Sequence, residues 1–278
     1  MAPPIIMHVN YCEQGQTIAE ICRKVAGWGY DGVEFRRVPT ALPYTTPEAY
    51  LDEIVREKQA SGLRQVVFGI GVRCLYPDAE QRRQEVQEAA RFMRLAAERF
   101  DLTVCNTSAQ GPLGKGSADA SEEAYEAGAE CFRALGDVAG ELGFRLAFEI
   151  HMGLIHDLPE PTMKLLSMID RPSVGANLDY GNIIYLKGAP SLQDSIKTVK
   201  EKLYYVHLKN SLGLRDGQRL KVGLEDGEIN NREFLRTLQQ IGYPGPICPE
   251  FPRNGDREWH AQRDLHYLKQ LLAELSWQ

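Results

Sequence analysis

The chain has 278 residues, of which 43% are hydrophobic and 25% charged, and its formal net charge is −6. This composition is ordinary for a soluble globular protein with a sizeable core. An acidic balance argues against a nucleic-acid partner, because binding the phosphate backbone requires clustered Lys and Arg. No apolar run approaches the roughly 18 residues that a membrane span needs, and the N-terminus lacks the basic flank of a signal peptide. We therefore expect a cytoplasmic protein that does not associate with membranes.

The cysteines are scattered, without a CxxC pair or a regular spacing. A disulfide framework or a zinc ribbon is therefore not expected, and buried reduced thiols fit the pattern better. The six positions are Cys12, Cys22, Cys74, Cys105, Cys131 and Cys248.

Strand-like and helix-like segments alternate along the whole chain. The expected strands are 5–10, 32–37, 64–70, 102–107, 145–151, 173–180, 203–210 and 245–251. The expected helices are 17–28, 47–61, 79–100, 120–140, 159–169, 191–200, 231–241 and 258–275. A long polar stretch, residues 211–229, separates the seventh strand from its helix.

Eight β–α units in order, with no linker and no shift in composition, predict an α/β fold in which residues 1–278 form one closed (β/α)₈ barrel domain. A Rossmann fold is not supported, because the turn after the first strand reads YCEQGQT and lacks the GxGxxG glycines.

Polar residues stand at or near the C-terminal ends of four consecutive expected strands: Glu149, Asp179, His207 and Glu250. In a parallel barrel these ends meet on one face, where active sites of this fold lie. Each residue alone could be an ordinary hydrogen-bonded strand end. Together, three carboxylates and one imidazole predict a site for a divalent metal ion.

Oxygen-rich ligation with one imidazole favours Mn²⁺, with Mg²⁺ or Co²⁺ also suited; Zn²⁺ is a further option, although it prefers more nitrogen or sulfur. A metal chelated by a substrate carbonyl and the adjacent hydroxyl would stabilise an enediolate, so that the neighbouring C–H bond can lose its proton. Glu149 and Glu250 are the expected acid and base. Proton return to the same carbon would make an epimerase, and return to the next carbon an isomerase.

The segments FEIH, NLDYGN, VHLKN and PEF, with the stretch from Gly227 through Ile229 to Gly242-Tyr243, resemble the xylose-isomerase-like barrel superfamily. Within it, the chain is similar to the sugar (phosphate) isomerase/epimerase group, which includes ketose 3-epimerases, hydroxypyruvate isomerase and inosose-handling enzymes. The resemblance implies that the four residues are metal ligands and that the two glutamates are the acid/base pair. It also implies that Glu34 orients a partner residue or the substrate. Homodimers and homotetramers are common among the proteins that the chain resembles, so a homo-oligomer is expected.

The chain departs from the ketose 3-epimerase pattern around the substrate. Asn182 stands where a second histidine is expected, and Ile155 where a glutamate is expected. An arginine six residues after His207 is absent, although Arg215 lies two positions further on. Glu225 replaces the first glycine of the G-x-G-x-[IV] loop. The metal ligands match while the substrate contacts differ, which predicts a different sugar or keto-polyol.

Other polar residues near the ends of the expected strands are further candidates for substrate contact. Alternation along a strand would place His151 on the side of Glu149 and Lys209 on the side of His207. The complete set of expected substrate-binding residues is His8, Glu34, His151, His156, Asn182, Lys209 and Arg215. The competing interpretation for the histidines is a core position in which the ring nitrogens are hydrogen-bonded. For Lys209 the competing interpretation is a surface position.

Several functions remain open from the sequence. A dehydratase or lyase would use the same carbanion to expel a β-substituent. An endonuclease IV-type repair enzyme would need many histidine ligands, and the chain has six histidines in total, one of them among the four expected ligands. A metal-free sugar-binding protein is the non-enzymatic alternative. No phosphate-binding loop is evident, which favours a non-phosphorylated substrate.

Overall fold

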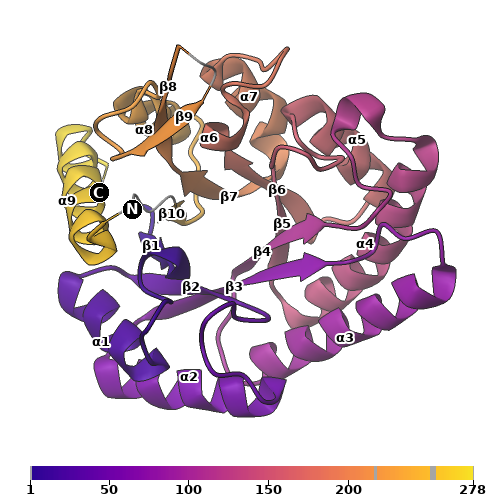
Figure 1. Ribbon diagram of the computed structural model, residues 1–278, viewed down its shortest axis with the longest axis horizontal. Coiled ribbons are helices and arrows are strands. Elements are labelled where there is room, and N and C mark those ends of the chain that lie inside the picture. Colours follow the sequence, from indigo (N-terminus) through magenta and orange to yellow (C-terminus); the bar gives the residue numbers. More distant parts are fainter. Residues whose placement is uncertain (1, 216–217, 251–254, 278) are drawn as a thin grey trace.

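The computed structural model describes residues 2–215, 218–250 and 255–277. Eight parallel strands surround the centre and helices cover their outer side (Figure 1). The strands follow the chain around the barrel: β1 (Ile6–His8), β2 (Gly32–Arg36), β3 (Gln65–Val72), β4 (Val104–Ala109), β5 (Arg145–Glu149), β6 (Val174–Asp179), β7 (Leu203–Leu208) and β10 (Ile247–Pro249). A parallel bridge between Ile5 and Ile247 brings the first and last strands together. The expectation of a (β/α)₈ barrel is confirmed.

The helices lie close to their expected positions because their boundaries carry local signals. Thr17 and Glu20 form a capping box at the start of α1, and Thr46 caps α2 ahead of Pro47. The helices are α1 (Ile18–Trp28), α2 (Pro47–Ser61), α3 (Ala79–Ala97), α4 (Glu122–Leu142), α5 (Pro159–Ile169), α6 (Tyr180–Ile183), α7 (Leu192–Val199), α8 (Asn231–Gln240) and α9 (Arg257–Glu274).

The strand register brings the functional side chains to one level of the barrel. His8 pairs with Glu34, and Asp179 pairs with His207. Beneath this level, the barrel interior is filled by a small apolar layer that one side chain from each of six strands provides: Ile6, Val67, Val104, Ala147, Tyr205 and Cys248. The polar residues therefore stand on a packed floor at the C-terminal end of the barrel.

Several features differ from the sequence expectation. The first strand ends at His8, and Val9–Tyr11 form a short 3₁₀ helix. Where the sequence showed only a long polar stretch after the seventh strand, an antiparallel hairpin forms from β8 (Asn210–Gly213) and β9 (Arg219–Val222). The last strand is shorter than expected, so Glu250 lies one residue beyond β10, with its N–H donating to Leu208 O. Phe251, the end of the expected strand, lies outside the described residues. Across the described ranges, no helix has the length and apolar character needed to span a membrane.

Candidate metal centre

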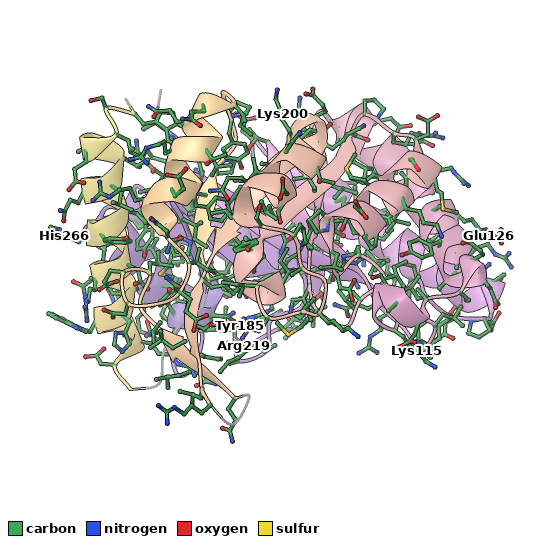
Figure 2. The ribbon with its side chains drawn as sticks, turned by 90° about the horizontal axis from the view of Figure 1, so that it is seen from above. Lys115, Glu126, Tyr185, Lys200, Arg219 and His266 are labelled. Carbon is green, nitrogen blue, oxygen red and sulfur yellow. The ribbon has the colours of Figure 1, made fainter. Side chains whose placement is uncertain are left out.

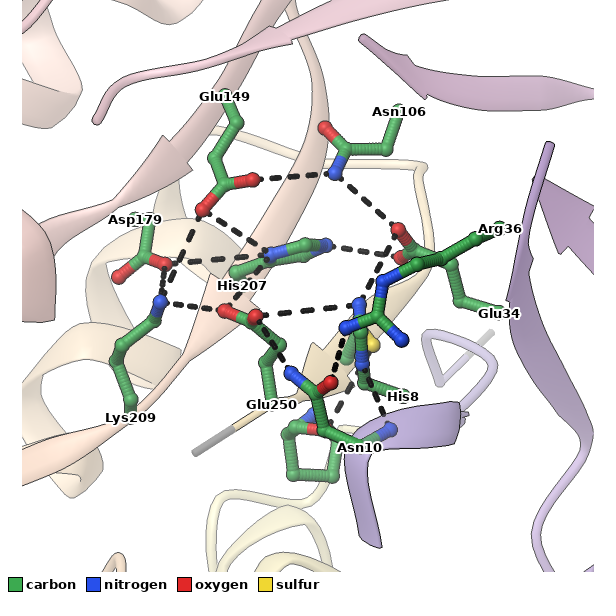
Figure 3. Close-up of polar contacts among 12 residues, drawn as sticks. His8, Asn10, Glu34, Arg36, Asn106, Glu149, Asp179, His207, Lys209 and Glu250 are labelled. Atoms are coloured by element: carbon green, nitrogen blue, oxygen red, sulfur yellow. Dashed lines mark hydrogen bonds and ion pairs between the residues drawn. The ribbon is translucent and has the colours of Figure 1, made fainter. Parts of the chain in front are cut away.

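The four predicted ligands meet at one point (Figure 3). One atom from each of Glu149, Asp179, His207 and Glu250 lies within 4.8 Å of all the others. His207 Nδ1 is 3.9 Å from Glu149 Oε1, 4.0 Å from Asp179 Oδ2 and 3.5 Å from Glu250 Oε2. Ligands held about 2.0–2.6 Å from one cation would have spacings of this size.

The ligand atoms are buried and face each other across a small space. Within the described residues, Asp179 Oδ2 and Glu250 Oε2 are both contacted by the ammonium group of Lys209, and His207 Nδ1 lies 3.5 Å from Glu250 Oε2. Buried carboxylates that converge in this way need a positive charge between them, which a cation can supply. The set of three carboxylates and one imidazole suits Mn²⁺ or Mg²⁺.

Lys209 brings a positive charge to the same point. Its Nζ is 2.6 Å from Asp179 Oδ2, contacts Glu250 Oε2 and lies 3.8 Å from Glu149 Oε1. Gly181 makes this approach possible, because a Cβ at that position would overlap the Lys209 side chain. The ammonium group thus stands among the three carboxylates of the candidate metal centre.

Glu34 holds the imidazole of His207 in place. Its Oε2 lies 2.9 Å from His207 Nε2 and accepts a 2.9 Å hydrogen bond from the Tyr205 hydroxyl. The Nε2–H of His207 therefore points to Glu34, which leaves Nδ1 facing the three acids. A carboxylate behind a ligating histidine fixes its tautomer and orientation. The expectation that Glu34 orients a partner corresponds to this geometry.

Side-chain amides hold the two glutamates. Asn106 Nδ2 donates to Glu149 Oε2 and to Glu34 Oε1, both at 3.2 Å. Asn182 Nδ2 donates to Glu149 Oε1 at 3.0 Å, while its Oδ1 accepts from Lys209 Nζ at 3.1 Å. Asn10 Nδ2 donates to Glu250 Oε1 at 3.1 Å. These contacts fix the carboxylate orientations without adding charge.

The electrostatic environment gives the buried acids different pKa values. Burial raises the pKa of Asp179 to about 7, although the charge of Lys209 opposes this rise. Burial alone would raise the pKa of Glu250, but Lys209, His8 and His207 hold it well below its usual value. For Glu34, His207 overcomes the effect of burial and lowers the pKa to about 2. Glu250 and Glu34 are therefore fully ionised at neutral pH.

A cavity of about 530 Å³ opens above the cluster. This volume is within the range of small-molecule sites. The described residues that line it are Asn10, His151, Met152, Gly181, Asn182, Lys209, Arg219, Lys221, Glu250 and Arg257.

The structure places three more predicted residues at or beside this cavity. His151 and Asn182 line it directly. His8 lies deeper, with Nε2 3.8 Å from Glu34 Oε1 and 3.9 Å from Glu250 Oε1. These positions are compatible with the expected substrate contacts, whose roles stay predictions.

Two predicted substrate contacts lie elsewhere. His156 is fully buried; its Nε2 accepts from Ala109 N at 3.1 Å and its Nδ1 lies 2.8 Å from Glu149 O. Both ring nitrogens therefore serve the backbone, and His156 links the ends of β4 and β5. Arg215 is exposed at the end of the hairpin and is not among the described lining residues; Arg219 is the hairpin arginine that reaches the cavity.

Sequence reasoning missed Asn10, Asn106, Arg36 and Arg219. Asn106 follows an apolar run in β4, the same signal that identified the four ligands. Asn10 is held by Arg36, which donates to its Oδ1 and also pairs with Glu13. No local signal marks Arg219, because its role depends on the hairpin.

The family described as xylose isomerase-like TIM barrel matches residues 22–271. The chain belongs to this family. Among solved structures, the fold is similar to a xylose isomerase-like TIM barrel protein from Mycobacterium smegmatis in complex with magnesium, with a TM-score of 0.78, 19% identity and coverage of 99% of this chain and 98% of that one. It is also similar to a D-psicose 3-epimerase (TM-score 0.77, 17% identity, 98% and 99% coverage). A probable 3-DHS dehydratase involved in petrobactin synthesis from Bacillus anthracis has a TM-score of 0.76, 16% identity and 96% and 98% coverage.

Among curated proteins, the chain is 26% identical over 158 residues to an inosose dehydratase from Clostridium perfringens. This match covers 50% of the chain and 51% of that protein, so the chain spans about half the length of the relative. The related proteins thus include sugar epimerases and dehydratases.

Proposed function

We propose that the protein is a divalent-metal-dependent sugar isomerase or epimerase that acts on a ketose or keto-polyol, with Mn²⁺ as the preferred ion and Mg²⁺, Co²⁺ or Zn²⁺ as alternatives. The observation that carries the proposal is the convergence of four ligand atoms within 4.8 Å beside the cavity. Glu149, Asp179, His207 and Glu250 would hold the ion. A bound divalent ion supplies positive charge that makes a C–H bond beside a carbonyl more acidic.

Proton transfer falls to the two glutamates. The amides of Asn106 and Asn182 hold both oxygens of Glu149, and Asn10 holds Oε1 of Glu250. The carboxylates come from different parts of the barrel, β5 and the end of β10, and can therefore approach a bound sugar from different sides. One removes the proton and the other returns it, which is general acid–base catalysis by positioned carboxylates.

A dehydratase or lyase is the second candidate. The related inosose dehydratase supports it. A repair nuclease of the endonuclease IV type fits less well, because the cluster contains one histidine. A sugar-binding protein without metal would not need three carboxylates and one imidazole within 4.8 Å of one another.

Solvent proton exchange tests the proposal. Metal-loaded protein is incubated with a panel of ketoses and inososes in D₂O, and the products are followed by NMR. We expect deuterium beside the carbonyl with an otherwise unchanged formula, and at least about a hundredfold slower exchange for Glu149→Gln and Glu250→Gln. Metal content is measured for each variant, because both residues would also be ligands. Release of water or another β-substituent would assign a lyase, and no exchange by protein that holds its metal would overturn the proposal.

A further inference from the structure

The cavity above the metal centre has an unequal charge distribution. Among its described lining residues are four cationic side chains, Lys209, Arg219, Lys221 and Arg257, and one carboxylate, Glu250. Lys209 is paired with the acids of the metal centre. The other three surround the opening from two sides, because Arg219 and Lys221 belong to the β8–β9 hairpin and Arg257 begins α9.

Arg219 is held in position by neutral groups. Its guanidinium stacks on the Tyr185 ring at 4.3 Å, and its Nη2 donates to Gly181 O and, at 3.4 Å, to Ser211 Oγ. Tyr185 is itself fixed, since its hydroxyl donates to Ser211 O at 3.1 Å. The hairpin projects from the end of the barrel with Tyr185 and Arg219 beside one another at its base (Figure 2).

Within the described ranges, no carboxylate lies within ion-pair distance of Arg219, and Asp179 and Glu228 act on it only from further away. Its contacts there are with carbonyl, hydroxyl, sulfur and aromatic groups. Its Nε is buried and has no hydrogen-bond partner there. A guanidinium that is oriented, partly buried and still has an unused donor is suited to bind a carboxylate or phosphate oxygen.

Lys221 and Arg257 extend the positive surface. Lys221 lies two residues after Arg219 on β9, so the two side chains share one face of the hairpin. On the opposite side of the opening, Arg257 also lines the cavity, and its Nη1 donates to Asn10 O at 3.2 Å. An excess of positive charge at the opening of a cavity raises the local concentration of anionic ligands.

We infer that Arg219, assisted by Lys221 and Arg257, forms an anion-binding subsite, and that the substrate carries a carboxylate or phosphate group in addition to the carbonyl that reacts at the metal centre. This inference rests on the proposed function for the reacting end of the substrate. It assigns a role to the hairpin that no sequence motif indicated. It also reopens the expectation of a non-phosphorylated substrate, because the anion site is built from side chains of the hairpin and of α9 rather than from a glycine-rich loop.

The test compares matched ligands on metal-loaded protein. Binding and solvent deuterium exchange are measured for D-fructose, D-fructose 6-phosphate and D-fructuronate, which differ in their anionic group. We expect the wild type to bind at least one of the two anionic compounds at least tenfold more tightly than D-fructose. The compound preferred distinguishes a phosphate from a carboxylate site.

The variants separate the subsite from direct binding of the anion to the metal. Arg219→Gln should remove the preference, and Arg219→Lys should retain part of it, since the charge remains while the planar fork is lost. Arg215→Gln is the matched control, because Arg215 is exposed on the same hairpin and is not a described lining residue. Melting temperature and metal content show whether each variant is folded and loaded.

Each outcome decides one of the two proposals. The subsite is overturned if folded Arg219→Gln keeps the anion preference, or if the wild type shows no preference. In either case the proton-exchange data still test the proposed isomerase reaction independently. If the anionic compounds bind through Arg219 but no compound exchanges its proton or is otherwise converted, the subsite stands and the proposed reaction is wrong.

Discussion

His207 and Glu34 form a buried pair in which the imidazole Nε2 lies 2.9 Å from the carboxylate Oε2. Both side chains are almost completely shielded from solvent, and the Tyr205 hydroxyl donates to the same oxygen. The attraction of Glu34 overcomes the effect of burial and raises the pKa of His207 well above its usual value. The pair fixes which nitrogen of His207 faces the metal centre, so Glu34 acts on the centre through the histidine.

Replacing Glu34 with Gln should weaken metal binding by about ten- to a hundredfold, the usual effect of losing a carboxylate behind a ligating histidine. The amide can present its N–H to Nε2 and so favour the tautomer in which Nδ1 carries the proton. Calorimetric titration with Mn²⁺ measures the change. Glu130→Gln, an exposed ion-pair residue on α4, is the control. Unchanged affinity in folded Glu34→Gln would show that Glu34 does not orient the ligand.

Lys209→Met should separate two effects of the ammonium group. Without a metal ion, the variant loses the cation between Asp179 and Glu250, and breaking a buried pair typically costs about 3–5 kcal/mol. With Mn²⁺, the variant no longer has a competing cation, so we expect about tenfold tighter binding. Melting temperatures with and without Mn²⁺, together with calorimetry, measure both effects. Exposed Lys187→Met is the control, and weaker Mn²⁺ binding by Lys209→Met would contradict competition for the same position.

The barrel and the convergence of the four candidate ligands were predictable because their signals are local. Alternating segments gave the order of the elements, caps such as Thr46 gave helix boundaries, and acids and a histidine at the ends of apolar runs gave the candidate metal centre. The rule that parallel strands meet at their carboxyl ends then converted four separate positions into one site.

The remaining features depend on three-dimensional contacts that no local pattern records. His156 stands in the segment between a strand and a helix, where substrate contacts of this fold lie. Its ring nitrogens instead contact backbone groups of β4 and β5. Arg219 reaches the cavity only because residues 211–229 fold partly into a hairpin. Asn106 carries a local signal, since it is a polar residue that follows the apolar start of β4.

Asn106→Leu should destabilise the protein by about 1–3 kcal/mol, because it leaves two buried carboxylate oxygens without a donor. One is Glu34 Oε1 and the other is Glu149 Oε2. The same change removes the acceptor of the Asn177 amide, whose Nδ2 lies 3.0 Å from Asn106 Oδ1. Denaturant unfolding of the metal-free protein measures the loss. A variant as stable as the wild type would show that the amide network contributes little to folding.

His156 should make stability depend on pH in a predictable direction. Burial lowers its pKa from 6.5 to about 4, so the folded protein binds the proton less readily than the unfolded chain does. The contribution to stability is therefore complete above pH 6.5 and is lost as the pH falls towards 4. The pKa difference corresponds to about 3 kcal/mol over the whole interval.

His156→Gln can keep both backbone hydrogen bonds and cannot bind a proton in this range. Its unfolding free energy should therefore fall about 2 kcal/mol less than that of the wild type between pH 7 and pH 4.5. Exposed His266→Gln is the control and should follow the wild type. Equal pH profiles for wild type and His156→Gln, measured by urea unfolding, would mean that His156 binds a proton equally well in the folded and unfolded states.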